Sequence, residues 1–163
     1  MALYDGLLFL HISAAILWIG SGFVLQLLAW RALRAGDGGT MLMVLGSMGS
    51  LGKVLFVPAS FATFLIGLGL VFTAGFAFTD LWIILGLCGF ASTFLTGVLV
   101  LEPTGKRIGA MVARDGVTEA AIAEGRRLLA ISRIDYVVLF LVVAVMVLKP
   151  TAANVAVLAV MGA

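Results

Sequence analysis

Histidine, cysteine, proline and charged side chains are all scarce in this chain of 163 residues. It holds one histidine (His11), one cysteine (Cys88) and three prolines, and only 11% of its residues are charged. A single cysteine excludes an intrachain disulfide and a CxxC-type site. A single histidine excludes the ligation of a haem or metal by two histidines of one chain. Soluble domains carry about 25% charged residues, so the low charge excludes a soluble fold.

Long apolar runs stand in place of the missing charge. Hydrophobic residues make up 63% of the chain, and the mean hydropathy is +1.25. Several windows reach the length of about 18 apolar residues that predicts a membrane-spanning helix. We therefore expect an all-α, polytopic membrane protein, a four-helix antiparallel bundle forming one domain over residues 1–163. The predicted helices cover about residues 5–32, 53–76, 81–101 and 134–149, and an apolar tail covers residues 151–163.

The connections between these helices carry the remaining local signals. Pro58 lies near the start of the second helix, where a proline is tolerated or produces a kink. The third helix should end before Pro103, because the residue preceding a proline disfavours α geometry. Residues 41–51 predict an interfacial segment or the first turns of the second helix. Residues 117–129 predict an amphipathic segment that leads into the fourth helix on the cytoplasmic side.

Basic residues are distributed unevenly between the two sides of the predicted bundle. Lys149 lies alone on one side, whereas the first and third connections hold the other nine: Arg31, Arg34, Lys53, Lys106, Arg107, Arg114, Arg126, Arg127 and Arg133. The positive-inside rule then places these connections in the cytoplasm and both termini on the outer side of a bacterial inner membrane. Aromatic residues do not interleave with the basic ones, so we expect the lipid bilayer and no nucleic acid as a partner.

His11 is the most informative single residue, because an imidazole within hydrocarbon costs free energy and asks for a reason. One interpretation is a neutral ring that hydrogen-bonds a neighbouring helix. The other is a ligand for haem or copper. Trp18, Met146 and Lys149 share the outer half of the bundle with His11, and imidazole with thioether suits haem iron or copper(I). Cys88 lies at a comparable depth and is a weaker ligand candidate.

Each companion of His11 also has a plainer explanation. A methionine in an apolar helix usually only fills space in the packing. Lys149 can be a cation at the end of a helix whose side chain extends to the membrane interface. In the functional interpretation, His11 is the axial ligand of a haem b near the outer face, and Lys149 pairs with a propionate.

Two further groups of residues have predicted structural roles. On the inner side, Lys53, Arg133 and Asp135 predict an ion-pair network between the second and fourth helices, or interfacial anchors. Small residues four apart predict helix packing in lipid. These stripes are Ala59, Thr63 and Gly67 on the second helix, and Gly89, Thr93 and Gly97 on the third. His11 and Asp135 lie near opposite ends of the bundle, so no His–Asp catalytic pair is predicted, and enzymatic activity is left open.

Three stretches carry a resemblance to known families: His11 with Trp18-Ile-Gly, then LGKVLFVPASFATFLIGLGL, then SRIDYVVLFLVVAVMVLKP. Together they resemble an uncharacterised family of small four-helix predicted integral membrane proteins. They are also distantly similar to copper-resistance D-type proteins and to the haem-containing bacterial membrane protoporphyrinogen oxidase. The resemblance implies that a histidine in the first helix binds haem or a metal. The relatives also share a lysine before a proline-containing second helix and a Lys-Pro pair that closes the last helix. The matching positions are His11, Lys53, Pro58, Arg133, Lys149 and Pro150.

The chain departs from the oxidase pattern in two places. Its third helix carries no lysine, and Ile134-Asp135-Tyr136 replaces an Asn-Glu-Pro-like segment. Three hypotheses follow. The chain binds haem b, or another redox metal, in a redox or haem-pathway role. Alternatively, it packs without a cofactor as a homo-oligomer or as an accessory subunit of a respiratory or photosynthetic complex. Copper handling ranks lower, since MxxM and HxxM clusters are lacking.

Overall fold

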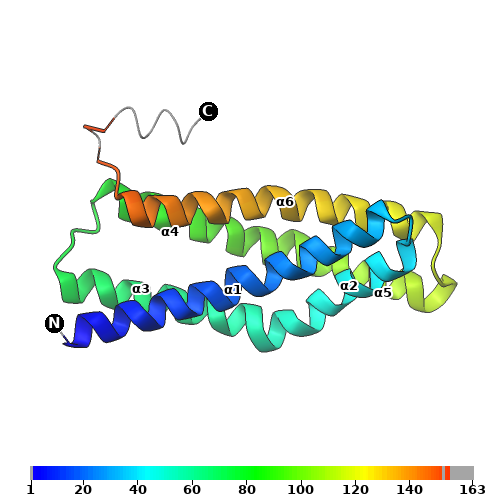
Figure 1. The fold of residues 1–163 in the computed structure, drawn as a ribbon, viewed down its shortest axis with the longest axis horizontal. Coiled ribbons are helices and arrows are strands. Elements are labelled where there is room, and N and C mark those ends of the chain that lie inside the picture. The colour runs from blue at the N-terminus through cyan, green and yellow to red at the C-terminus, as the bar shows by residue number, and fades with distance from the viewer. Residues whose placement is uncertain (1, 152, 155–163) are drawn as a thin grey trace.

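The computed structural model describes residues 2–151 and 153–154, except for the side chains of residues 49–53, and its regular elements are all helical (Figure 1). No strand occurs among these residues, which confirms the all-α prediction. In chain order the elements are α1 (Ala2–Arg34), α2 (Gly38–Leu51), the π-helical turn η1 (Gly52–Phe56), α3 (Val57–Ala74), α4 (Leu81–Thr96), the π-helical turn η2 (Gly97–Leu101), α5 (Glu102–Asp115) and α6 (Glu119–Leu148).

Four helical stretches of the described chain are long and apolar enough to cross a membrane, as predicted. They are Ala2–Arg34, Val54–Ala74, Leu81–Asp115 and Glu119–Leu148. The N-terminus and the end of α6 lie at the same end of the bundle, which we call the terminal end (Figure 1). The opposite end, with α2 and α5, is the charged end. Most of the predicted tail, residues 151–163, lies outside the described residues.

The helices extend further at the charged end than the sequence predicted. Residues 41–51 belong to α2, which continues through η1 into α3. The prediction that the third helix ends before Pro103 is wrong, because the chain remains helical from Leu81 to Asp115. The predicted amphipathic segment is confirmed as helix, since from Glu119 onward it is continuous with α6.

Both prolines within the helical stretches directly follow a π-helical turn. Pro58 is the second residue of α3, after η1, and Pro103 is the second residue of α5, after η2. In an α-helix a proline ring clashes with the carbonyl four residues earlier. Those carbonyls belong to Val54 and Leu99, which lie inside the two π turns. The wider turns therefore explain why the helices continue through positions that usually end them.

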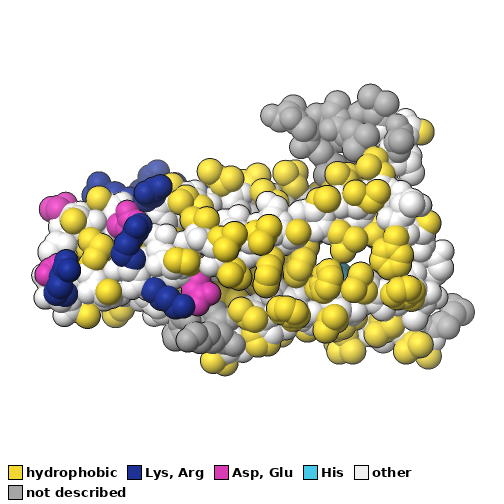
Figure 2. Space-filling view, turned by 180° about the vertical axis from the view of Figure 1, so that it is seen from behind, with side chains coloured by type: hydrophobic (Ala, Val, Ile, Leu, Met, Phe, Trp, Pro, Cys, Tyr) yellow, Lys and Arg dark blue, Asp and Glu magenta, His cyan; other side chains and the backbone are white. Residues whose placement is uncertain are grey.

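The charged end holds a well-packed hydrophobic core. Gly125 of α6 lets α2 approach closely, because a Cβ there would lie 2.7 Å from Leu42 Cδ2 and 2.8 Å from Met41 Cε. The buried residues of this core are Ala29, Ala32, Met41, Leu42, Leu45, Ile108, Ala121, Leu128 and Leu129. Charged side chains gather toward this end of the molecule, while hydrophobic side chains cover the rest of the visible face (Figure 2).

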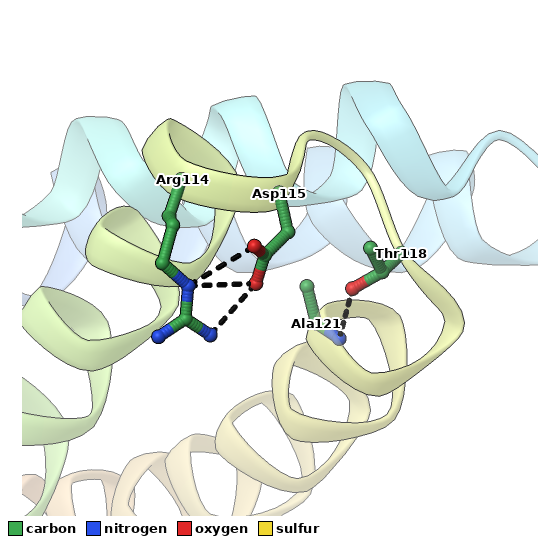
Figure 3. Close-up of polar contacts among 4 residues, drawn as sticks. All are labelled: Arg114, Asp115, Thr118 and Ala121. Atoms are coloured by element: carbon green, nitrogen blue, oxygen red, sulfur yellow. Dashed lines mark hydrogen bonds and ion pairs between the residues drawn. The ribbon is translucent and has the colours of Figure 1, made fainter.

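Short polar motifs set the turns at the charged end. Asp37 begins α2: its carboxylate accepts the Thr40 N–H at 2.8 Å and the Thr40 hydroxyl at 2.6 Å. These bonds, first the hydroxyl and then the N–H, hold the pKa of Asp37 below its ordinary value. Between α5 and α6, Arg114 pairs with Asp115, and the Thr118 hydroxyl accepts the Ala121 N–H at 3.3 Å to begin α6 (Figure 3).

The four spanning helices associate as two pairs. α1 packs along α3, and α4 packs along α6, whereas α3 and α4 stay apart although a short turn joins them. The pairs meet through α1 and α6, where the Tyr136 hydroxyl lies where a Cβ of Gly22 would be. This arrangement leaves room between the two pairs toward the terminal end.

Candidate functional site

A cavity of about 680 Å³ lies between the two helix pairs at the terminal end. We call it the terminal cavity. Its volume falls within the range of about 300–1,000 Å³ typical of small-molecule and cofactor sites. Its walls come from α1, α3, α4 and α6 and are almost entirely apolar, and they include all four predicted cofactor-binding residues: His11, Trp18, Met146 and Lys149. In Figure 2 a small patch coloured for histidine is visible through an opening in the hydrophobic face.

The His11 side chain is half-buried and fixed by α3. Its Nδ1 lies 2.8 Å from the Thr63 carbonyl oxygen. A carbonyl only accepts hydrogen bonds, so Nδ1 carries a proton and donates, and in a neutral ring this leaves a lone pair on Nε2. The predicted hydrogen bond from His11 to a neighbouring helix is therefore present. The same bond is also the one that usually orients a metal-binding histidine.

Gly67 provides the space for this imidazole. A Cβ at Gly67 would lie 3.0 Å from His11 Cε1 and 3.3 Å from Nδ1, closer than side chains normally pack. Thr63 and Gly67 are one helical turn apart on α3. The Thr63 carbonyl holds the ring, and the absence of a side chain at Gly67 makes room for it. Both belong to the stripe of small residues that the sequence singled out, together with the buried Ala59.

The α4–α6 pair forms the opposite wall. Met146 lines the cavity, and its methyl group occupies the place that a Cβ of Gly86 would take. Gly86 had no predicted role, but it lies close to the predicted stripe on α4. Within that stripe, Gly89 packs against Val142 and Thr93 is buried, whereas a Cβ at Gly97 would meet nothing within 4 Å.

Aromatic rings of α1, α3 and α4 line the terminal cavity and contact one another. Trp18 meets Phe90 edge-on, with ring centroids 5.7 Å apart. Phe90 stacks on Phe64 at 4.9 Å and on Phe94 at 6.0 Å. These rings bridge α1, α3 and α4 where the helix backbones stay apart, and Phe94 lines the second cavity described below.

Lys149 ends α6 at the terminal end in an unusual conformation. Its backbone has φ 44° and ψ 58°, the left-handed region that lysine seldom adopts, and its N–H bonds the Val145 carbonyl at 2.9 Å. Its ammonium lies 4.7 Å from the centre of the Phe76 ring and 5.1 Å from that of Trp82. The cation–π contacts hold the charge at the edge of the cavity. The sequence analysis did not predict these contacts, although aromatic residues on either side of the 77–80 turn were a possible signal for them.

The remaining ligand candidate lies elsewhere. Cys88 is exposed and is not part of the cavity wall. Among the residues that the structure describes, no group of three histidine, cysteine, aspartate or glutamate side chains is placed to hold a metal ion. His11 and Met146 are therefore the imidazole and thioether that the cavity offers to a metal.

A second, smaller cavity of about 210 Å³ lies toward the charged end and contains Asp135 in its wall. We call it the charged-end cavity. Arg133 is exposed and forms no ion pair with Asp135 in the described part of the chain. The side chain of Lys53, the third member of the predicted ion-pair network, lies outside the described residues. Across this end, Arg107 of α5 pairs with Glu124 of α6.

Comparison with protein-family models identifies the family of this chain. A family model described as "Predicted integral membrane protein (DUF2269)" matches residues 6–150, from the first turns of α1 to Pro150. Neither the curated proteins nor the solved structures gave a match, so the predicted likeness to copper-resistance D-type proteins and to the oxidase has no support from them. Since the family model covers most of the chain, the protein belongs to this family of predicted integral membrane proteins, DUF2269.

Proposed function

We propose that the terminal cavity holds a haem b, with Nε2 of His11 as an axial ligand, and that the protein acts in redox or haem-pathway chemistry. One observation carries the proposal: the only histidine of the chain lines a cavity between two helix pairs with its Nδ1–H already bound to the Thr63 carbonyl. Such a bond fixes the tautomer in which Nε2 is free to bind iron.

The residues around the cavity fit this group. The lining is apolar, as haem sites between bundle helices are. His11 stands on the α1–α3 wall and Met146 on the α4–α6 wall, so imidazole and thioether face the cavity from opposite helix pairs. Lys149 lies at its terminal edge, where an ammonium suits a propionate. When bound, haem b would supply one-electron chemistry at a potential set by its axial ligands.

Each residue then has a defined task. The Thr63 carbonyl orients the imidazole and increases its basicity. Gly67 gives the ring its position against α3. Met146 supplies the thioether or leaves that position to a substrate. Lys149 exchanges its contact with the Phe76 and Trp82 rings for one with a carboxylate.

Titration of the purified protein with hemin in detergent tests this proposal. The wild type and Cys88→Ala should give a saturating Soret band with one haem per chain, since Cys88 lies at a similar depth but outside the cavity. Gly67→Ala, which displaces the ring, should weaken binding by about 10–100-fold, the usual effect of disturbing a ligand's support. His11→Ala should weaken haem binding by a larger factor than Gly67→Ala. Equal titrations of His11→Ala and the wild type would refute the proposal.

Copper handling is the weaker metal proposal. Copper(I) prefers several soft or imidazole ligands, and the cavity wall offers only His11 and Met146. Metal analysis of protein purified without chelator distinguishes the two proposals, since copper at one equivalent per chain without a Soret band would favour copper.

Orientation and partners complete the proposal. We infer that the charged end faces the cytoplasm of a bacterial inner membrane, because nine of the ten basic residues belong to the connections at that end. The terminal cavity then opens in the outer leaflet. Assembly as a homo-oligomer or as an accessory subunit of a respiratory or photosynthetic complex stays a prediction. Co-purification of a stoichiometric partner in mild detergent, lost on truncation after Pro150, tests it.

A further inference from the structure

The charged-end cavity is chemically different from the terminal cavity. Its wall contains the carboxyl groups of Asp135 and Glu102 and the hydroxyl groups of Ser60, Ser132 and Tyr136 among apolar residues. The cavity lies within the membrane-spanning bundle, with Phe94 in its wall. Ionisable side chains at such depth are costly and usually have a function.

Asp135 is a half-buried carboxyl group within a spanning helix. Among the described residues it has no ion-pair partner. Its titratable neighbours in the cavity wall are Tyr136 on its own helix and Glu102 at the start of α5, while α1 and α3 contribute no charged side chain to that wall. A lone carboxylate in such surroundings is stabilised by donors or by a proton.

The nearby serines do not supply such donors. Ser60 donates its hydroxyl hydrogen to the Val57 carbonyl at 2.9 Å, and Ser132 donates to the Leu129 carbonyl at 3.0 Å. Each hydroxyl has a single hydrogen, so both oxygens face their surroundings as acceptors only. A protonated carboxyl group can donate to such an oxygen, and an ionised one cannot. The hydrogen bonding of the wall therefore favours a bound proton.

A further acceptor lies on α1 next to this wall. Gln26 is only 7% exposed, and its Oε1 has no hydrogen-bond donor within the described structure. It stands one helical turn from Gly22, which lines the cavity and contacts the Tyr136 hydroxyl. The face of α1 that carries Gly22 thus also carries a buried acceptor without a donor among the described residues.

We propose that the charged-end cavity is a proton-binding site in which the Asp135 carboxyl takes up a proton from water at the charged end. The proton leaves a hydronium ion, one carboxylate oxygen becomes a hydroxyl group, and that hydroxyl donates to an acceptor of the wall. The site does not depend on haem in the terminal cavity.

Labelling of the full-length protein in liposomes with dicyclohexylcarbodiimide tests the proposal, because this apolar reagent modifies protonated carboxyl groups within membranes. Peptide mass mapping should find an adduct at Asp135 near neutral pH, and its yield should fall as the pH is raised. Asp135→Asn should remove this adduct, whereas Glu102→Gln should retain it. No adduct at Asp135 at any pH, or a yield independent of pH, would overturn the proposal.

An ion pair between Lys53 and an ionised Asp135 is the alternative to a proton on Asp135. If Lys53 forms the ion pair with Asp135 that the sequence predicted, the wild type will not be labelled at Asp135 and Lys53→Met will be, which also overturns the proposal. Infrared spectroscopy gives an independent readout on the wild type: a carboxylic C=O stretching band that shifts in Ser132→Ala supports the site. Absence of that band contradicts it, even where Asp135→Asn fails to fold.

Discussion

The fit between His11 and Gly67 makes a quantitative prediction. In Gly67→Ala the new Cβ would lie 3.0 Å from His11 Cε1, and the ring cannot withdraw without stretching its 2.8 Å bond to Thr63. Forcing a methyl group into a filled site costs about 1–3 kcal/mol. Gly69→Ala is the matched control two residues later on α3, where the Cβ meets only Leu7 Cδ1 at an ordinary 3.8 Å. Removing a helical glycine there should stabilise by about 0.5–1 kcal/mol.

Both substitutions gain the same helix propensity, so the free energies of unfolding of the two variants should differ by about 1–3 kcal/mol, with Gly67→Ala the less stable. Reversible unfolding in detergent, followed by circular dichroism, measures this difference. In a His11→Ala background the obstructing ring is absent, and the difference should vanish. The double-mutant cycle therefore assigns the effect to the pair. An equal difference in both backgrounds would refute the assigned position of the imidazole.

Three further predictions concern the ends of the bundle. The lowered pKa of Asp37 means that its cap on α2 is fully present above the ordinary value of 3.8 and is lost as the pH falls through the lowered pKa. Amide exchange at Thr40 should therefore accelerate only in strong acid, and Asp37→Asn should remove this dependence on pH. Gly125→Ala should destabilise by about 1–3 kcal/mol through its clash with Met41 and Leu42. Gly109→Ala, whose Cβ meets nothing within 4 Å, should not, and chemical unfolding compares the two. Lys149→Met should lose about 0.5–1 kcal/mol of cation–π energy and alter Trp82 fluorescence, whereas an unchanged emission spectrum would contradict the contact.

Hydropathy sufficed to predict the four spans, because burial in lipid demands long apolar helices whatever their packing. The boundaries at Pro58 and Pro103 were harder. A proline usually indicates a break in an α-helix, and the residues next to Pro58 and Pro103 did not indicate that a π-helical turn would precede each of them. For residues 41–51 the sequence left two alternatives open, and the structure confirms the one that made them the first turns of the second helix, since α2 continues through η1 into α3.

The candidate site shows a similar division. Depth alone placed His11, Met146 and Lys149 near one another, since helix register converts sequence position into distance along the membrane normal. The pairing of α1 with α3 and of α4 with α6, which opens the terminal cavity, involves close contacts at Gly67 and Gly86. A single sequence that contains several stripes of small residues does not reveal which helix each stripe contacts. Lys149 ends α6 in the left-handed conformation that glycine usually takes at a helix C-terminus, so its residue type gave no signal for it.

The visible absorption spectrum of the protein purified from cells supplied with haem tests the central claim most directly. Haem bound through His11 predicts a Soret band with close to one haem per chain by pyridine haemochrome assay, absent from His11→Ala and present in Cys88→Ala. A colourless wild-type protein, or a His11→Ala variant with an unchanged spectrum, would contradict it.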